Sequence, residues 1–452
     1  MKYNAHFTGI GGAGASVLAR LAMDLGYSVS GSDIKKSPLT DSLQREGTAF
    51  YEGHSPENIP ENTRLLVYSS AVPEDNPELV RAKERNIPIM ERAEFLGKVF
   101  SLFEKPIAVS GTHGKSTATA MVSAILSAAD FSPTCLIGAD TADSDFGYIK
   151  GSRNYLVAEA CEYRDGFLNL SPFCGIILNI EYEHPDYFRS IESEADSFRR
   201  FAGKISPLGF LVIDRQTDVN FRISENALCE TCFFDISPEN PKHLFYPLNL
   251  REEKGFYSFD FMFEDRFLGR IRLSVPGLHN VKNALAAGGA AYLLGVAPQV
   301  ICRALSAFSG VKRRLEHKGT FNGADIYDDF AHHPTEISAS LTAIKKMTGK
   351  RVICLFQPHT YSRTYALFDE FLQALSMADE VLLAPIYAAR EKYTESVNSE
   401  NLSDSLRAMG KSAANFGNFY EIEKYLKKNL TPEDVLVIMG AGDIDRVLNS
   451  LK

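Results

Sequence analysis

The sequence predicts an α/β fold that is divided into three domains. Short apolar runs alternate with segments of helical periodicity along most of the chain, as in parallel sheets connected by helices. A strand that leads through a loop into a helix recurs at three places: near residue 5, near residue 106 and after Gly310. The 452 residues suffice for about two to four domains. We therefore expect domains at 1–103, 104–312 and 313–452.

The first predicted domain begins with a strand at residues 5–10. A helix follows, because apolar residues recur on one of its faces, and Gly26 ends it. That apolar face consists of Val17, Leu18, Leu21 and Leu25. The next strand is expected at residues 27–31.

The second predicted domain opens with a strand that ends at Ser110 and a helix that runs to Ala129. Its further buried strands are expected at 155–160, 174–180 and 210–213. Residues 214–275 are rich in Phe, Asp and Glu with alternating polarity, which predicts a small antiparallel insertion. The strands of the third domain are expected at 326–330, 351–356, 381–386 and 435–439.

Composition and charge disfavour several classes of function. The net charge is −9, so the protein has no overall attraction for nucleic acid or for an anionic membrane. No apolar run reaches the length of a membrane span, and Met1–Asn4 leads into a strand and not into a signal peptide. Seven scattered cysteines then indicate reduced thiols in the cytoplasm. Cys229 and Cys232 have zinc-ligand spacing without a second pair, so a surface hairpin is expected there.

The first functional motif is a glycine-rich loop at Gly9–Gly14, which matches G-x-G-x-x-G between a strand and a helix. Glycines let the backbone approach a diphosphate, and the helix N-terminus supplies N–H groups. Asp33 lies about 20 residues further on, where an acid binds ribose in dinucleotide-binding folds. By itself this motif favours an NAD-type ligand, with a tight turn that binds nothing as the alternative.

The second motif, Gly111–Thr117, predicts an ATP site. It follows a strand and opens a helix, so its backbone amides can cradle phosphate. Lys115 can reach the terminal phosphates, and the Ser116 hydroxyl can bind Mg²⁺. The standard phosphate loop would have glycine at position 109, where this chain has Val109. The alternative is a glycine turn with a solvated lysine.

A metal site is expected beside this loop. Glu159 ends a buried strand and His184 follows another, and ligands of open α/β sheets bind at the carboxyl ends of the strands. Together with Ser116, this carboxylate and imidazole could hold a divalent cation next to the phosphates. A salt bridge or a capping role is the alternative for both residues.

Further polar segments lie at loop positions. Pro276–Asn283 precedes an Ala-rich helix, where an N-cap is the alternative to a ligand contact, and Lys312–Arg314 is either a solvated basic face or a phosphate clamp. Asp328–Thr335 and Gln357–Thr364 each follow a strand and fit a domain cleft. Two adjacent histidines in the first of these segments point in divergent directions. Because no third ligand lies at metal spacing, we expect no zinc there.

Taken together, these segments resemble the Mur ligases of peptidoglycan synthesis. The resemblance runs nearly from end to end, with the same order and spacing of segments. The matching segments are HFTGIGGAG, VSGSD, SSA, GTHGKSTAT, AEACEYRDGFL, NIEYEHPDYF, PGLHNVKNALAA, GVKRRLE, DDFAHHPTE, FQPHTYSRT, PIYAARE and MGAGDI.

The resemblance implies a Rossmann-like N-terminal domain, a P-loop ATPase-like central domain and a Rossmann-like C-terminal domain. The first would bind the UDP of a sugar substrate, which makes the glycine motif a UDP-diphosphate site and not an NAD site. The implied UDP-sugar residues are Gly11, Gly12, Ala13, Gly14, Asp33, Ser69 and Ser70. The implied ATP residues are Gly111, Thr112, His113, Gly114, Lys115, Ser116, Thr117, Asn283 and Arg314. The implied metal ligands are Ser116, Glu159 and His184, and the implied catalytic residues are Lys115, His333, His359 and Arg363, the last three facing the substrate cleft.

The implied reaction joins L-alanine to the lactyl carboxylate of UDP-N-acetylmuramate, with ATP and Mg²⁺. The carboxylate first takes the γ-phosphoryl group, and the amine then displaces phosphate from the acyl phosphate. Two residues near the expected amine pocket depart from the family pattern, since Phe330 stands where many relatives have tyrosine and Thr360 where many have arginine. The resemblance is to cytoplasmic enzymes, and we expect a monomer or a homodimer.

Three alternatives stay open at this point. A recycling ligase that attaches a whole peptide to the same UDP-sugar shares the architecture and the ATP loop. An oxidoreductase would use the N-terminal glycine motif, and the phosphate loop argues against it. A non-catalytic UDP-sugar sensor is disfavoured by the presence of Lys115, Glu159 and His184.

Overall fold

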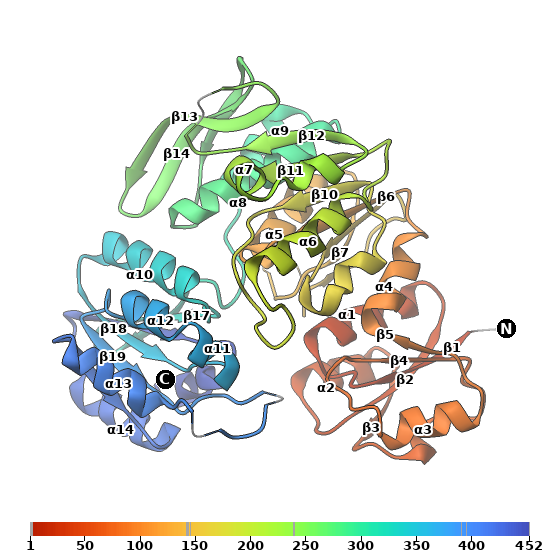
Figure 1. The fold of residues 1–452 in the computed structure, drawn as a ribbon, viewed down its shortest axis with the longest axis horizontal. Coiled ribbons are helices and arrows are strands. Elements are labelled where there is room, and N and C mark those ends of the chain that lie inside the picture. Colours follow the sequence, from red (N-terminus) through yellow and green to blue (C-terminus); the bar gives the residue numbers. More distant parts are fainter. Residues whose placement is uncertain are drawn as a thin grey trace.

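Three sheets, each with its own helices, form three lobes of the protein (Figure 1). The computed structural model describes residues 3–141, 144, 146–237, 240–389, 391–394 and 396–451. We call the lobes N-terminal (β1 to α4), central (β6 to α9) and C-terminal (β16 to η4, a 3-10 helix at Ile444–Ser450). In Figure 1 the central lobe lies above the other two. Helix α4 of the N-terminal lobe and helix α10 of the C-terminal lobe are the helices on the sides that face it. Within the described residues, no helix is both long and apolar enough to cross a membrane.

The N-terminal lobe has a five-stranded parallel sheet in the order β3-β2-β1-β4-β5. The strands are β1 (Asn4–Thr8), β2 (Ser28–Asp33), β3 (Ala49–Glu52), β4 (Leu65–Tyr68) and β5 (Ile89–Glu91). The helices are α1 (Ala13–Asp24), α2 (Pro38–Arg45), α3 (Pro77–Glu84) and α4 (Arg92–Phe100). The expected strand–loop–helix order is confirmed, but the first strand ends earlier, at Thr8, because Gly9 turns the chain with φ 80°.

The central lobe is built on a ten-stranded sheet in the order β15-β14-β13-β12-β11-β10-β6-β9-β7-β8. Its parallel centre consists of β6 (Lys105–Ser110), β9 (Tyr155–Glu159), β10 (Cys174–Ile177), β11 (Phe210–Asp214) and β12 (Glu230–Phe234), with β7 (Thr134–Leu136) and β8 (Tyr148–Ile149) at one edge. Its helices are α5 (Lys115–Ala128), α6 (Ile191–Ala202), α7 (Arg215–Phe221), α8 (Leu278–Leu293) and α9 (Pro298–Ala307).

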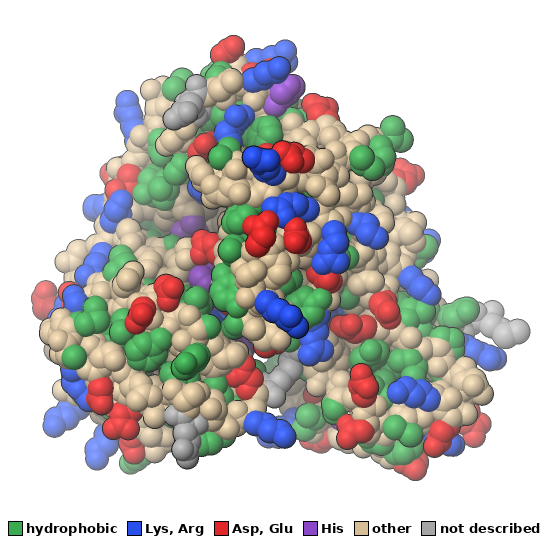
Figure 2. Space-filling model, viewed as in Figure 1, with side chains coloured by type: hydrophobic (Ala, Val, Ile, Leu, Met, Phe, Trp, Pro, Cys, Tyr) green, Lys and Arg blue, Asp and Glu red, His purple; other side chains and the backbone are tan. Residues whose placement is uncertain are grey.

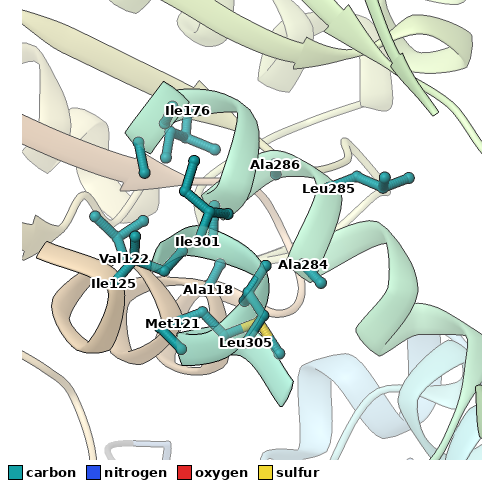
Figure 3. Close-up of a cluster of buried hydrophobic side chains, with 14 of the residues drawn as sticks. Ala118, Met121, Val122, Ile125, Ile176, Ala284, Leu285, Ala286, Ile301 and Leu305 are labelled. Atoms are coloured by element: carbon teal, nitrogen blue, oxygen red, sulfur yellow. The ribbon is translucent and has the colours of Figure 1, made fainter. Parts of the chain in front are cut away.

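The core of the central lobe places two helices at the phosphate loop (Figure 3). Met121, Val122 and Ile125 of α5 pack against the alanine-rich face of α8 and against Ile301 of α9. A fully buried side chain of this size contributes roughly 1.5–3 kcal/mol. The small side chains of α8 allow close approach, which brings the N-terminal part of α8 to the start of α5.

The expectation of a small antiparallel insertion at residues 214–275 is wrong in part. β12 pairs in parallel with β11 and with the start of β13 (Leu244–Glu253), and only β14 (Phe256–Phe263) and β15 (Arg266–Arg272) are antiparallel. All of them continue the main sheet, because their apolar alternation gives one face that packs on α8 and α9. The expected surface hairpin at the cysteine pair is also wrong, since Cys232 lies fully buried in the parallel strand β12.

The C-terminal lobe has a six-stranded sheet in the order β16-β17-β21-β18-β19-β20, in which only the edge strand β16 is antiparallel. The strands are β16 (Glu316–Phe321), β17 (Ala324–Asp329), β18 (Arg351–Phe356), β19 (Glu380–Leu383), β20 (Ser412–Asn415) and β21 (Asp434–Met439). The helices are α10 (Pro334–Thr348), α11 (Tyr361–Ala366), α12 (Phe368–Leu375), α13 (Ser399–Ala408) and α14 (Phe419–Asn429). The four strands expected here are all present.

Candidate active site

The phosphate loop is clamped from two sides. Gly111 (φ 129°) and Gly114 (φ 84°) adopt backbone conformations that favour glycine, and a Cβ atom at Gly114 would lie 2.7 Å from Oδ1 of Asn283 in α8. On the other side, Asn179 after β10 accepts a 2.8 Å hydrogen bond from the backbone N–H of His113. The loop therefore owes its shape to α8 and β10 as well as to its own glycines.

Lys115 folds back over this loop and pairs with a carboxylate that the sequence did not single out. Its Nζ donates to the backbone oxygens of Gly111 (2.6 Å) and Thr112 (3.0 Å) and lies 3.1 Å from Glu162. Burial alone would lower the pKa of Lys115, but the charge of Glu162 outweighs it and raises the pKa above its ordinary value. Lys115 is thus held as a cation. Its partner Glu162 is 1% exposed.

The three implied metal ligands line one cleft. Ser116, Glu159 and His184 all contribute to its wall, so that Glu159 and His184 lie beside the loop. His184 Nε2 lies 3.5 Å from Glu162 and 3.6 Å from Glu183. Glu159 accepts a hydrogen bond from the backbone of Gly138. A hydroxyl, a carboxylate and an imidazole at a cleft wall are a donor set that fits a divalent cation.

This cleft has a volume of about 920 Å³ and receives side chains from all three lobes. Gly11 and Ala13 come from the N-terminal lobe, and Thr112 and Lys115 from the phosphate loop. The C-terminal wall includes Arg314, together with Phe330, His332 and Glu336. A ligand that spans the cleft can therefore touch the glycine motif and the phosphate loop at once.

A second cavity of about 250 Å³ lies on the other side of the phosphate loop. Asn283 of α8 and Arg314, the two implied ATP residues outside the loop, both line it. His113, Gly114 and Thr117 complete the wall toward the loop. A nucleotide that places its phosphates on the loop can extend into this cavity.

The three implied catalytic residues of the C-terminal lobe are placed differently from the expectation that they face the cleft. Neither His333, His359 nor Arg363 is among the side chains that line the large cleft, whereas Glu183 is. Arg363 is 5% exposed, and its guanidinium makes a bidentate ion pair with Glu183 (2.5 and 2.8 Å) and donates to Nδ1 of His359 (2.9 Å). Burial on its own would raise the pKa of Glu183, but the Arg363 charge holds it well below its ordinary value.

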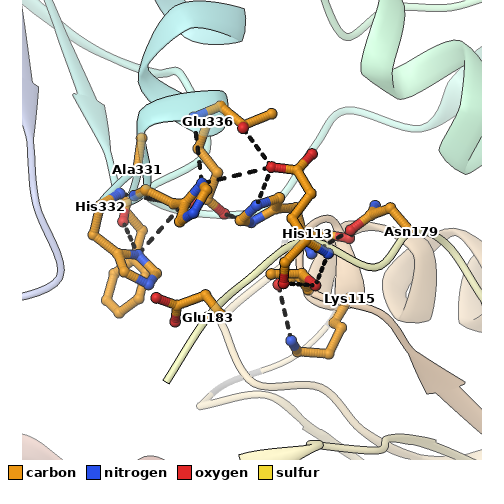
Figure 4. Close-up of polar contacts among 12 residues, drawn as sticks. His113, Lys115, Asn179, Glu183, Ala331, His332 and Glu336 are labelled. Carbon is orange, nitrogen blue, oxygen red and sulfur yellow. Dashed lines mark hydrogen bonds and ion pairs between the residues drawn. The ribbon is translucent and has the colours of Figure 1, made fainter. Parts of the chain in front are cut away.

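A cluster of histidines and carboxylates joins the central and C-terminal lobes (Figure 4). His113 of the phosphate loop lies 3.4 Å from Glu336 of α10 and 3.5 Å from Glu181. Burial would lower the pKa of His113, but these two carboxylates raise it to about 9. The neighbouring His333 ring, 4.5 Å away between centroids, has its pKa lowered to about 4 by burial and by the charge of His113. One ring is thus protonated and the other neutral at neutral pH.

The glycine motif of the N-terminal lobe is held mainly by hydrogen bonds to residues at the end of β2. The backbone N–H groups of Gly9 and Ile10 donate to the carbonyl of Ser32, and Gly11 donates to Asp33 (2.8 Å). Asp33 thus shapes the loop directly, a contact that the sequence pattern did not reveal. A Cβ atom at Gly14 would lie 2.8 Å from the guanidinium of Arg92, a basic residue that sequence reasoning missed.

The two serines implied in UDP-sugar binding follow β4, next to the same motif. Ser69 donates its backbone N–H to the carbonyl of Thr8, and a Cβ atom at Gly9 would lie 3.2 Å from the side chain of Ser69. Ser70 is half-buried at the following position. Of the N-terminal candidates, Gly11 and Ala13 line the large cleft, whereas Ser69 contacts the loop at Gly9.

A buried carboxylate joins β1 and β2, the two strands whose ends hold this loop. Glu78 of α3 is fully buried and accepts hydrogen bonds from His6 (3.2 Å), Thr8 (2.7 Å) and Ser32 (2.6 Å). Burial on its own would raise the pKa of Glu78, but the hydrogen bonds from His6 and Ser32 lower it to about 2. The lowered pKa means that this carboxylate stabilises the folded state when it is ionised.

We expect Glu78 to contribute about 3 kcal/mol to the free energy of unfolding at pH 6. Because its folded pKa is lowered, the contribution is complete above pH 4.5, the ordinary value, and is lost as the pH falls toward 2. Urea titrations of Glu78→Gln and of the unchanged protein should therefore differ most at pH 6 and converge in acid. Glu84→Gln, an exposed carboxyl of the same helix, serves as the control. A difference that is independent of pH contradicts the assignment.

The two residues that depart from the family pattern occupy distinct positions. The Phe330 ring lines the large cleft and lies beneath the guanidinium groups of Arg313 (5.1 Å) and Arg314 (5.4 Å). Thr360 precedes α11 with φ 65°, where it accepts a hydrogen bond from the backbone of Arg363. Phe330 is therefore in a position to contact a substrate.

The fold and the site define a three-lobed, nucleotide-using ligase, and the chain belongs to the Mur ligase family. Family models match it in three consecutive parts: the "Mur ligase family, catalytic domain" at residues 4–104, the "Mur ligase middle domain" at 109–291 and the "Mur ligase, glutamate ligase domain" at 313–442.

The chain is also similar to individual curated proteins over its whole length. It is 42% identical to the UDP-N-acetylmuramate–L-alanine ligase of Clostridium acetobutylicum over 98% of this chain and 96% of the relative. It is 43% identical to the enzyme of the same name from Caldicellulosiruptor bescii over 98% and 97%.

Among solved structures, the UDP-N-acetylmuramate–alanine ligase of Thermotoga maritima matches with a TM-score of 0.84 and 27% identity, covering 99% of this chain and 98% of that one. A murein peptide ligase of Psychrobacter arcticus matches with a TM-score of 0.76 and 25% identity over the same shares.

Proposed function

We propose that this chain joins L-alanine to the lactyl carboxylate of UDP-N-acetylmuramate, at the expense of ATP. The identity of about 42% over nearly the whole chain to proteins named for that activity carries the proposal. The large cleft supports it, because one continuous space connects the glycine motif with the phosphate loop. In this proposal the domains are 1–103 for the UDP-sugar, 104–312 for ATP and 313–452 for ligation. The protein acts in the cytoplasm as a monomer or homodimer.

A carboxylate is a poor electrophile, so it first attacks the γ-phosphorus of ATP and forms an acyl phosphate, with ADP as leaving group. Lys115, held as a cation, exchanges Glu162 for the phosphoryl oxygens and stabilises the charge that develops on them. Ser116, Glu159 and His184 would hold Mg²⁺, which would supply further positive charge for the phosphoryl transfer. Asn283 and Arg314 hold the rest of the nucleotide in the second cavity.

The amine of L-alanine then attacks the acyl carbon, and inorganic phosphate leaves. The lobes contribute by holding the two reactants in contact, which can supply roughly 7–11 kcal/mol in favourable cases. They also keep water from the acyl phosphate. The Arg363–Glu183 pair holds the C-terminal lobe against the central lobe while this happens.

The acceptor is the part of the proposal that is tested most directly. We expect phosphate release from ATP in the presence of UDP-N-acetylmuramate to depend on L-alanine and to be much slower with other amino acids or with the tripeptide that a recycling ligase uses. Omission of the UDP-sugar is the control and should abolish release. Equal or faster turnover with the tripeptide would move the assignment to the recycling ligase.

A further inference from the structure

One carboxylate of the C-terminal lobe, that of Glu336 in α10, contacts both the phosphate loop and an implied ATP residue. Its side chain is 12% exposed, and Oε1 lies 3.4 Å from Nδ1 of His113 and 3.5 Å from Nη1 of Arg314. Figure 2 shows histidine side chains along the line where the central and C-terminal lobes meet, and Figure 4 shows Glu336 beside His113. A single oxygen therefore joins a residue of the loop to an arginine that precedes β16.

The other oxygen of Glu336 is held by the start of its own helix. Oε2 accepts hydrogen bonds from the backbone N–H groups of His332 (3.1 Å) and His333 (3.4 Å) and lies 3.3 Å from Nδ1 of His332. These contacts belong to the capping box of α10. Capping uses Oε2 and requires no partner in another lobe, so it does not account for the contacts of Oε1.

Glu336 also lies between the two cavities of the site. Glu336, Arg314 and Gly114 of the phosphate loop each line both the large cleft and the smaller cavity. In the proposed function, on which this inference rests, ATP extends from the smaller cavity onto the loop. The nucleotide then passes the point at which Glu336 holds His113 and Arg314, so the position of this carboxylate sets the arrangement of the two around the nucleotide.

The charges of the three groups fit this arrangement. Burial on its own would raise the pKa of Glu336, but the His332, His113 and Arg314 side chains hold it well below its ordinary value. His113 is a cation at neutral pH, because its pKa is raised to about 9. An ionised carboxylate thus lies between an imidazolium and a guanidinium, which would repel each other without it.

We propose that Glu336 is a positioning residue of the ligase, which holds Arg314 and the phosphate loop in the arrangement that binds ATP. It acts through His113 and Arg314 and does not itself bind the phosphates, because its negative charge would repel them. An arginine that is held in place before the nucleotide arrives loses less conformational freedom on binding, and the affinity for ATP is higher for that reason.

The test is calorimetric binding of a non-hydrolysable ATP analogue with Mg²⁺ to the full-length protein. Glu336→Gln keeps the shape of the side chain and can still accept the two backbone hydrogen bonds, but it lacks the charge. We expect its affinity for the analogue to fall ~10-fold or more, with binding of UDP-N-acetylmuramate unchanged. Glu370→Gln, an exposed acid of α12, is the control and should bind the analogue as the unchanged protein does.

Steady-state kinetics separate positioning from a general loss of structure. In Glu336→Gln the KM for ATP should rise by a similar factor, while kcat and the KM for the UDP-sugar change little. A uniform loss in all three would indicate a structural role and overturn the proposal. Unchanged ATP affinity would overturn it as well, and would leave the assignment of L-alanine ligation to the unchanged protein intact.

A double-mutant cycle asks whether Glu336 acts through Arg314. Arg314→Met alone should weaken binding of the analogue, and adding Glu336→Gln should then weaken it much less than in the unchanged protein. Losses that add in full overturn the proposal.

Glu336→Asp provides a second variant at the same position, whose folding is checked with that of the others by circular dichroism and thermal melting. It keeps the charge but is one methylene shorter, so it cannot reach His113 and Arg314 while its own helix is capped. We expect weaker binding of the analogue here too. Normal affinity in every folded variant at position 336 overturns the proposal.

Discussion

Lys115→Ala is expected to lower the rate of ligation by a factor of ~10²–10³ or more, while binding of UDP-N-acetylmuramate survives. Lys115 is the cation of the phosphate loop, and the UDP-sugar is proposed to rest mainly on the N-terminal lobe, beside Gly11 and Ala13. The measurements are phosphate release under saturating substrates and calorimetric binding of the UDP-sugar. Near-normal turnover in this variant would remove the loop from the mechanism.

The substitution has a side effect that needs its own control. It leaves Glu162 buried without its partner, and removal of one member of a buried ion pair typically costs about 3–5 kcal/mol. The double variant Lys115→Ala/Glu162→Gln also removes the negative charge of Glu162, so that no buried charge is left unpaired. We expect it to regain thermal stability but not activity, because the loss of rate comes from the missing cation. Recovery of activity in the double variant would show that the stranded charge caused the loss.

The second large effect is expected at the Arg363–Glu183 pair. Arg363→Met should lower turnover by ~10²-fold, the size of loss that a misplacement of about 1 Å can cause. The pair joins the two lobes by a bidentate contact, and both side chains are about 5% exposed or less. Without Arg363 the Glu183 carboxylate is buried and unpaired, so opening of the lobes, which hydrates it, is favoured. Small-angle scattering should then report a larger radius of gyration.

Two further variants make this expectation specific. Glu183→Gln in addition to Arg363→Met leaves no stranded charge, and the radius of gyration should return toward the original value. Arg407→Met removes a half-exposed arginine of the same lobe, whose partner Asp404 is itself exposed. It should leave turnover and size unchanged. An Arg363→Met protein that stays compact and active would exclude this pair as a clamp.

Much of the site could be predicted because its signals are local. A glycine at a turn, a lysine and a hydroxyl at the start of a helix, and polar residues at strand ends are each defined by a few neighbouring residues. Glu159, His184 and Ser116 were found in this way, and they do line one cleft. The partner Glu162 was visible in the same segment as Glu159, but nothing in the local pattern distinguished its role.

What the local pattern did not contain is the pairing of residues far apart in the chain. Residues 214–275 show alternating polarity. An antiparallel insertion and a continuation of the main sheet with one covered face both produce this pattern, so the pattern does not distinguish them. The distinction depends on where α8 and α9 pack. The two cysteines before and within β12 were misassigned to a surface hairpin for the same reason.

By itself the sequence determined that this protein is a three-part α/β chain with a phosphate loop, a second glycine loop and polar strand ends, because hydrophobic periodicity and turn chemistry act over a few residues. Only the tertiary structure decided which charges neutralise one another. Glu183 meets Arg363 across 180 positions, and His113 meets His333 between two lobes. Such contacts depend on the packing of whole lobes, in which a buried charge must find a partner wherever the fold supplies one.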